Sequence, residues 1–181
     1  MNTFYLLRHG EVCIDKSKPP SEWTLSHEGV TQVHELAKKG TFANVDLIYS
    51  SEEGKAFHTA QIIAGSIGKE ALKLSNFNEL HRNTFVGSYE SAIRKAFARI
   101  NESSSGWESC LSALHRFREG IELINMKCRN KRILIVSHGI VLTLYFAHLN
   151  GKMNDLLSRW KKLNFLSYGV VKDSQVVKDI V

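Results

Sequence analysis

The chain contains short apolar runs of strand length, separated by longer segments in which apolar residues recur at helical spacing. Residues 4–8 form the first apolar run and residues 132–137 form another. Both runs are predicted to be buried strands. Each is followed directly by a His-Gly pair, at positions 9–10 and 138–139. Open α/β sheets bind ligands at the carboxyl ends of their strands, so we expect both histidines to contribute to one site.

The rest of the chain alternates between predicted helices and strands. Ser26 is a predicted N-cap for a helix that ends near Gly40. Further helices are predicted at residues 54–67, 91–100, 107–128, 139–149 and 152–160. Further strands are predicted at residues 45–49 and 72–74, and on both sides of a turn at 172–174 within the tail, 165–181. This order predicts a three-layer α/β/α fold whose mostly parallel central sheet carries an antiparallel strand or hairpin at one edge.

Composition narrows the class of protein without selecting a ligand. With 181 residues, 43% of them hydrophobic and 23% charged, residues 1–181 are expected to form a single globular domain. The formal net charge of +6 indicates an affinity for anions. The basic residues are spread along the chain, and neither zinc-type spacing nor an aromatic RNA-binding motif occurs. A nucleic-acid partner is therefore not expected.

The cysteines and the lengths of the apolar runs predict a cytoplasmic protein. Cys13, Cys110 and Cys128 are widely separated and odd in number, which suits a reducing compartment. No apolar stretch reaches the roughly 18 residues of a membrane span, so no membrane association is expected. The first predicted strand follows Met1 so closely that no signal peptide is expected.

The residues at the two strand ends suit phosphoryl transfer. A neutral His9 imidazole can attack an electrophile when a backbone carbonyl holds its other nitrogen. Arg8 carries a fork of donors that matches phosphate or carboxylate. Gly139 opens a helix after His138, and the free amides of that first turn could hold an anion. The alternative is that both histidines are structural, but their pairing beside an arginine favours a site.

Several motifs give the chain a resemblance to the histidine phosphatase superfamily, also called phosphoglycerate mutase-like, over nearly its whole length. The string LLRHGE at residues 6–11 looks like the family signature. Weaker matches follow in the family's order at residues 25–32, 50–60, 106–116 and 136–139. The resemblance implies a phosphoglycerate mutase-like fold and a reaction through phosphohistidine.

By resemblance, His9 is the nucleophile that becomes phosphorylated. Arg8 and His138 are implied to bind and neutralise the phosphoryl group, with Gly10 and Gly139 as further phosphate-binding positions. No cofactor and no metal ion are implied.

Other positions depart from the family pattern. Lys55 replaces the family's second arginine, which keeps the charge without the bidentate fork, and the alternative is a solvated helix lysine. Glu52 replaces a proline, and Glu53 follows it. Both acids would repel phosphate if they faced inward, but a helix start is the preferred placement. Asp15 stands where many members have asparagine, and it is a predicted substrate contact.

The family's general acid has two candidate positions here. Residues 77–79 match the family's Leu-x-Glu and make Glu79 the acid, with a local insertion before Gly87. Counting back from Gly87 instead places Asn83 there, and an amide cannot donate the proton. His81 and Arg82, in the same loop, are predicted to contact substrate.

Three functions are compatible with this sequence. The first is a metal-independent phosphatase that hydrolyses a small phosphorylated metabolite, with a phosphoprotein as the alternative substrate. The second is a phosphoglycerate mutase. The resemblance implies that the mutases that use a bisphosphoglycerate primer carry an inserted segment in the middle, for which this chain has little room. The third is a catalytically weak relative that binds a phosphorylated ligand. The sequence names neither the substrate nor the oligomeric state.

Overall fold

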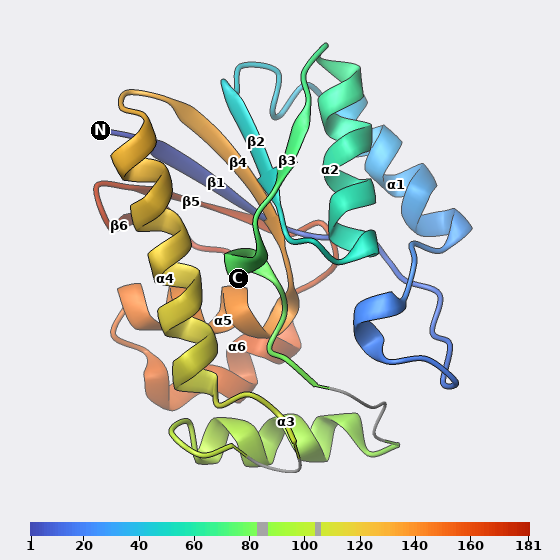
Figure 1. Ribbon diagram of the computed structural model, residues 1–181, viewed down its shortest axis with the longest axis vertical. Coiled ribbons are helices and arrows are strands. Elements are labelled where there is room, and N and C mark those ends of the chain that lie inside the picture. Colours follow the sequence, from blue (N-terminus) through green and yellow to red (C-terminus); the bar gives the residue numbers. More distant parts are fainter. Residues whose placement is uncertain (83–86, 104–105) are drawn as a thin grey trace.

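The computed structural model describes residues 1–82, 87–103 and 106–181, and its centre is a six-stranded mixed sheet (Figure 1). The strand order is β3-β2-β4-β1-β5-β6. Strands β3, β2, β4 and β1 are parallel, whereas β5 runs antiparallel to β1 and forms a hairpin with β6. The strands are β1 (Thr3–Arg8), β2 (Leu47–Ser50), β3 (Ala71–Lys73), β4 (Arg132–Ser137), β5 (Tyr168–Lys172) and β6 (Gln175–Lys178).

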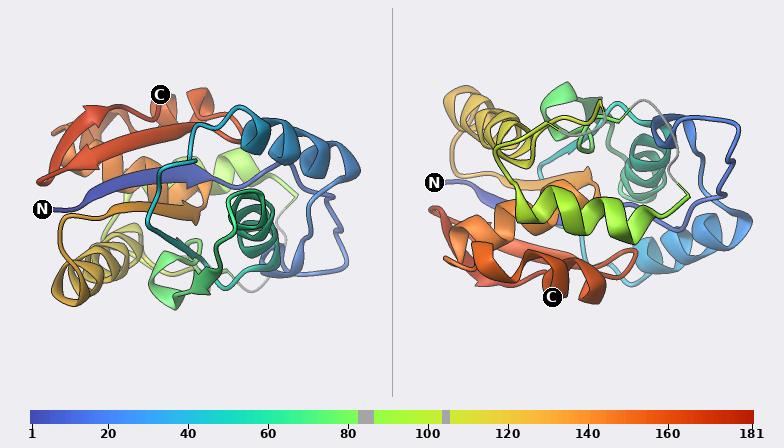
Figure 2. Two further views of the ribbon diagram at one scale, coloured as in Figure 1. Left: turned by 90° about the horizontal axis from the view of Figure 1, so that it is seen from above. Right: turned by 90° about the horizontal axis from the view of Figure 1, so that it is seen from below.

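Helices cover both faces of this sheet (Figure 2). Helices α1 and α2 pack on one face, α4 and α5 pack on the other, and α6 lies against α5. Helix α3 packs against α6, away from the sheet (Figure 1). The bounds are α1 (His27–Lys38), α2 (Gly54–Ser66), α3 (Tyr89–Ala98), α4 (Cys110–Lys127), α5 (Gly139–Leu149) and α6 (Leu156–Lys162), with short 3-10 turns at Pro20–Glu22, Ser75–Phe77 and Met153–Asp155.

Alternation along the central strands builds two separate cores. In β1, Phe4 and Leu6 face the core beneath α4 and α5, whereas Leu7 faces the core beneath α1 and α2. In β4, Ile133 faces the core beneath α4 and α5, and Val136 faces the core beneath α1 and α2. The three-layer α/β fold with an antiparallel edge hairpin is thus confirmed.

Local signals in the sequence explain several element ends. The Ser26 side chain accepts a hydrogen bond from the Gly29 amide and caps α1, as predicted. Asp173 and Ser174 both have positive φ, which gives the tight turn between β5 and β6. Helix α4 starts later than predicted, because Ser109 is its N-cap and Trp107 is buried in the preceding loop.

The predicted helix over 152–160 is instead a 3-10 turn followed by α6, and β2 starts at Leu47 rather than Val45. None of the helices in the described segments combines the length and apolar composition needed to cross a bilayer.

Candidate active site

The sheet brings the two histidines together at the carboxyl ends of β1 and β4. These strands are parallel neighbours, and Arg8 pairs in register with Ser137. The His9 amide donates to the Ser137 carbonyl over 3.0 Å, so the residues after both strands lie side by side. The imidazole centroids of His9 and His138 are 5.1 Å apart.

His9 has the orientation that a nitrogen nucleophile requires. Its Nδ1 lies 2.7 Å from the Gly10 carbonyl oxygen, and a carbonyl can only accept, so Nδ1 carries the proton. The lone pair is then on Nε2. Burial is the largest cause that lowers the pKa of His9 well below its usual range, and the neighbouring His138, Lys55 and Arg8 act in the same direction. His9 is therefore a neutral imidazole at physiological pH.

His138 is fully buried beside it and is also neutral. Its Nε2 lies 2.7 Å from the Ser51 hydroxyl, at the end of the neighbouring strand β2. Its Nδ1 is buried and has no hydrogen-bond partner among the described residues. Burial lowers the pKa of His138 well below its usual range, and the nearby cations Lys55, Arg82, Arg8 and Arg116 act in the same direction.

Arg8 is held at the strand end by backbone and aromatic contacts. Its guanidinium stacks 4.3 Å from the centroid of the Phe165 ring and donates to the Leu163 carbonyl. A Cβ atom on Gly139 would lie 3.4 Å from the Arg8 guanidinium carbon, so the start of α5 lies against this cation. Burial lowers the pKa of Arg8 from its usual value. Its Nε is buried without a hydrogen-bond partner among the described residues.

Lys55 is buried at the start of α2 and is not a solvated helix lysine. Its Nζ donates to the Pro20 carbonyl over 2.7 Å and to the Glu53 carboxylate. It is among the cations that lower the pKa values of both histidines, which places its charge at their site.

Glu53 is a site residue that sequence reasoning did not identify. It is the N-cap residue of α2, as a helix start predicts, yet its carboxylate also faces inward. Oε1 accepts from the Glu79 amide over 2.8 Å and lies 3.6 Å from His138 Nε2. The other oxygen, Oε2, pairs with Lys55. Its place shortly after the end of β2 at Ser50 was the available signal, because that strand pairs with β4, which ends beside the histidines.

Glu79 is buried, and its carboxylate caps α5. Its oxygens accept from the amides of Leu80, Ile140 and Val141 at 3.0, 3.0 and 3.1 Å. The amides of the first turn of α5, which we expected to be free for a bound anion, are instead occupied by the protein's own Glu79 side chain. The amides of Ile140 and Val141 are consequently engaged and not free for a ligand. Asn83, the other candidate position for the general acid, lies outside the described residues.

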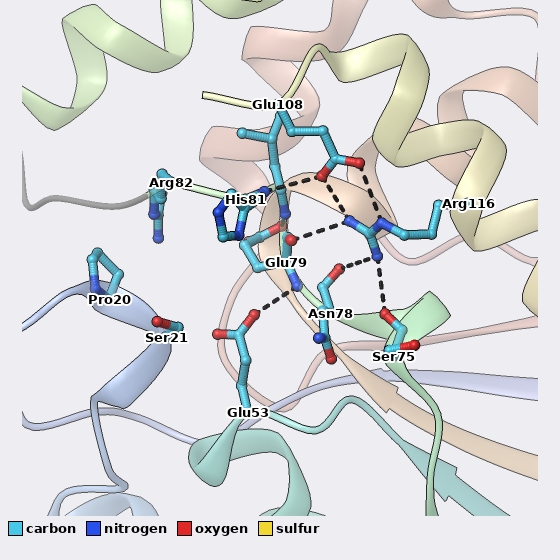
Figure 3. A pocket seen from close by; sticks show the side chains of 11 residues that line it. Pro20, Ser21, Glu53, Ser75, Asn78, Glu79, His81, Arg82, Glu108 and Arg116 are labelled. Atoms are coloured by element: carbon cyan, nitrogen blue, oxygen red, sulfur yellow. Dashed lines mark hydrogen bonds and ion pairs between the residues drawn. The ribbon is translucent and has the colours of Figure 1, made fainter. Parts of the chain in front are cut away.

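A cleft of about 460 Å³ is lined by Glu53 and Glu79 among others (Figure 3), and neither His9 nor His138 is among its lining residues. Glu53 connects the cleft to the histidine pair, because its carboxylate lies 3.6 Å from His138 Nε2.

Arg116 fixes the segment that forms the wall of the cleft. The Arg116 guanidinium donates to four backbone carbonyls and pairs with Glu108 at 2.8 Å, while Glu108 also accepts from the His81 amide. The four carbonyls are those of Ser75, Asn76, Asn78 and Glu79.

Two of the three predicted substrate contacts line this cleft, and the third does not. His81 and Arg82 line it, and Arg82 stacks on Tyr89 and donates to its hydroxyl. Asp15 is not among its lining residues, and its carboxylate instead accepts from Ser17 in its own loop.

Gly10 has a backbone role in the described structure. Its amide donates to the Thr59 hydroxyl over 3.1 Å, and a Cβ atom at this position would lie 2.9 Å from Val33 Cγ2. No cluster of three or more His, Cys, Asp or Glu side chains suited to a metal ion occurs within residues 1–82, 87–103 and 106–181.

The sheet order, the edge hairpin and the two strand-end histidines define a phosphoglycerate mutase-like α/β protein. Residues 4–172 match the histidine phosphatase superfamily (branch 1), and the chain belongs to this family. A curated relative, "Probable phosphoglycerate mutase GpmB" from Erwinia tasmaniensis, is 24% identical over 81% of this chain and 74% of its own.

Solved structures share the fold. A mycobacterial glucosyl-3-phosphoglycerate phosphatase complexed with VO3 superposes with a TM-score of 0.79 at 19% identity, covering 98% of this chain and 96% of that one. A phosphoserine phosphatase mutant from Entamoeba histolytica, in complex with phosphoserine, gives a TM-score of 0.71 at 22% identity, covering 98% and 95%. Proteins that share this fold thus include phosphatases.

Proposed function

We propose that the chain is a metal-independent phosphatase that hydrolyses a small phosphorylated metabolite through a phosphohistidine on His9. The observation that carries this proposal is the orientation of His9. A neutral, buried imidazole whose Nδ1 is held by a carbonyl presents Nε2 as a nucleophile. A merely structural histidine beside Arg8 and His138 has no need of this arrangement.

The surrounding groups supply charge for phosphoryl transfer. Arg8 and Lys55 are the cations that would neutralise the non-bridging oxygens, and His138 would donate a hydrogen bond. His9 Nε2 forms a bond to phosphorus while the bond to the leaving oxygen breaks. A glutamate next to His138 protonates that oxygen, a role that the resemblance gives to Glu79. Water then attacks the phosphohistidine and releases phosphate.

The cleft and the structural neighbours support the proposed substrate class. The cleft has room for a small alcohol part of the substrate, and His81 and Arg82 on its wall are proposed to contact it. The neighbours bind phosphoserine and vanadate, and one is a glucosyl-3-phosphoglycerate phosphatase, which supports a small phosphorylated metabolite as the substrate.

The test is phosphate release from a panel of phosphorylated metabolites with EDTA present, together with trapping of labelled phosphohistidine. We expect turnover to persist in EDTA and His9→Ala to lose both labelling and turnover. Labelling that survives in His9→Ala, or turnover that EDTA abolishes, would contradict the proposal. Failure of every substrate to label the wild type would instead favour a protein that only binds phosphorylated ligands.

Phosphoglycerate mutase is the second candidate, because curated relatives carry that name. A mutase returns the phosphoryl group from the histidine to the sugar acid, whereas a phosphatase gives it to water. Phosphate release should exceed isomerisation when phosphoglycerate is supplied. Rapid isomerisation with negligible release of phosphate would assign the mutase activity instead.

A further inference from the structure

The Glu53 carboxylate lies between the histidine pair and the cleft. It is 3.6 Å from His138 Nε2, and Glu53 is one of the residues that line the cleft. Figure 3 shows the carboxylate rising into the cleft from the start of α2. The side chain is only 10% exposed, so little solvent screens its charge. A substituent close to the phosphoryl group of a substrate would therefore meet this carboxylate.

Glu53 is held in place at both oxygens and still has acceptor capacity. Oε1 accepts from the Glu79 amide over 2.8 Å. Oε2 pairs with Lys55, which also donates to the Pro20 carbonyl. An ionised carboxylate has about four acceptor sites, so each oxygen keeps one for a further donor. Glu53 can thus bind a donor group of the substrate without releasing Lys55.

The charges at the phosphoryl position favour a positive substituent on the substrate. The Lys55 ammonium has three N–H donors. Two of them are used by Glu53 and Pro20, which leaves one for a phosphoryl oxygen. A bound phosphoryl dianion then shares Lys55 with Glu53. An ammonium group on the substrate would supply the missing positive charge, whereas a carboxylate would be repelled by Glu53.

Other charged side chains of the cleft are already engaged. Glu108 and Arg116 pair at 2.8 Å, and Arg116 also donates to four backbone carbonyls. Arg82 stacks on the Tyr89 ring and donates to its hydroxyl. Glu53 therefore offers the cleft both a negative charge and spare acceptor sites next to the histidines.

We propose that Glu53 selects phosphomonoesters whose alcohol part carries an ammonium group close to the phosphate, and that it disfavours those with a carboxylate there. The substrate class is then the phosphates of small amino alcohols. This inference rests on the proposed phosphatase function, and it leaves the proton transfer proposed for Glu79 unchanged. It also counts against phosphoglycerate, whose carboxylate would face Glu53.

The test compares three phosphomonoesters of two-carbon alcohols that differ in the charge of one group. Phosphoethanolamine carries an ammonium group, ethyl phosphate carries no further charge, and phosphoglycolate carries a carboxylate. We expect kcat/KM for phosphate release at neutral pH to fall in that order. A hydrogen bond to a charged group corresponds to roughly tenfold to a hundredfold between the first two. For an ester that is not turned over, its Ki against p-nitrophenyl phosphate takes the place of kcat/KM.

Variants separate the effect of Glu53 from the different reactivities of the three esters. Glu53→Gln keeps the size of the side chain and removes its charge. It should lower the ratio of phosphoethanolamine to ethyl phosphate by about tenfold or more and raise that of phosphoglycolate to ethyl phosphate. Glu53→Asp keeps the charge and should retain part of the preference. These ratios cancel any general loss that comes from a disturbed Lys55.

Glu52→Gln is the matched control. It removes an equal charge one residue earlier, from an exposed side chain that bonds to Asn78. Its ratios should equal those of the wild type.

Two results would overturn the role of Glu53. One is a set of ratios in Glu53→Gln that equals the wild-type set. The other is a wild-type preference for phosphoglycolate, which would assign the recognition of an acidic substituent to Arg82. Either result with normal labelling of His9 leaves the phosphatase proposal intact. Absence of both labelling and turnover in the wild type removes the phosphatase proposal and this inference with it.

Discussion

At the scale of single residues, the neutral states of His9 and His138 link the site to pH. In the unfolded chain both imidazoles take up a proton near pH 6.5. In the folded protein burial lowers both pKa values, so His9 and His138 take up a proton only at a lower pH. The unfolded state therefore binds more protons below about pH 6.5, and the folded state loses stability as the pH falls.

We expect the free energy of unfolding to decrease by up to about 1.4 kcal/mol per pH unit for each of these histidines between about pH 6.5 and 5. The measurement is urea unfolding at several pH values. His138→Asn removes one titrating group and should reduce the slope, whatever its effect on the absolute stability. A slope equal to that of the wild type would show that His138 does not stay neutral in the folded protein.

The same residues show what the sequence could and could not predict. His9, His138 and Arg8 were predictable because each stands at the end of an apolar run, and the pairing of β1 with β4 then brings them together. The inward turn of Glu53 was not predictable, because it depends on the positions of Lys55 and the Glu79 amide. Lys55 is only two residues away, but the contact with Glu79 joins residues that are 26 apart in the sequence, and the local pattern around Glu53 does not reveal it.

At the scale of elements, α1 is held against the loop after β1 by close backbone packing. A Cβ atom on Gly29 would clash with the carbonyl oxygen of Glu11, two residues after His9. Glu11 also accepts a hydrogen bond from the Ser26 amide at the N-cap of α1. The start of α1 and the loop after β1 therefore form one packed unit.

Gly29→Ala is expected to lower the free energy of unfolding by about 1–3 kcal/mol, because the added methyl overpacks this contact. Gly54→Ala is the matched control, since a Cβ atom there meets nothing within 4 Å, and stability should be unchanged or raised. Chemical denaturation of the two variants decides the point. Equal stabilities of Gly29→Ala and Gly54→Ala would mean that the loop after β1 can shift to accommodate the added methyl group at little cost.

Element boundaries were predictable where a local signal exists and less so where packing decides. Ser26 caps α1 through its own hydroxyl, so its position in the sequence suffices. The start of α4 depends on Trp107, which packs in the loop beside Tyr89 instead of continuing the helix. The spacing of an aromatic residue in the sequence does not show whether it lies in the helix or packs in the loop before it.

At the scale of the whole molecule, we propose that residues 1–181 unfold as one domain. The two cores lie on opposite faces of one sheet, and β1 and β4 contribute side chains to both. Loss of either core would expose the same strands. A single calorimetric transition with equal van't Hoff and calorimetric enthalpies is the expected outcome. Two separable transitions would show that the faces unfold independently.

The burial of α5 has a consequence for how the chain is made. Most of this helix is apolar and buried, and β5 passes so close to it that a Cβ atom on Gly169 would clash with Phe146. During translation α5 leaves the ribosome before β5, so the strand that covers part of α5 is synthesised after it. Until then its apolar surface is a natural binding site for chaperones. A shortened chain that ends before Tyr168 would keep that surface exposed and is expected to aggregate.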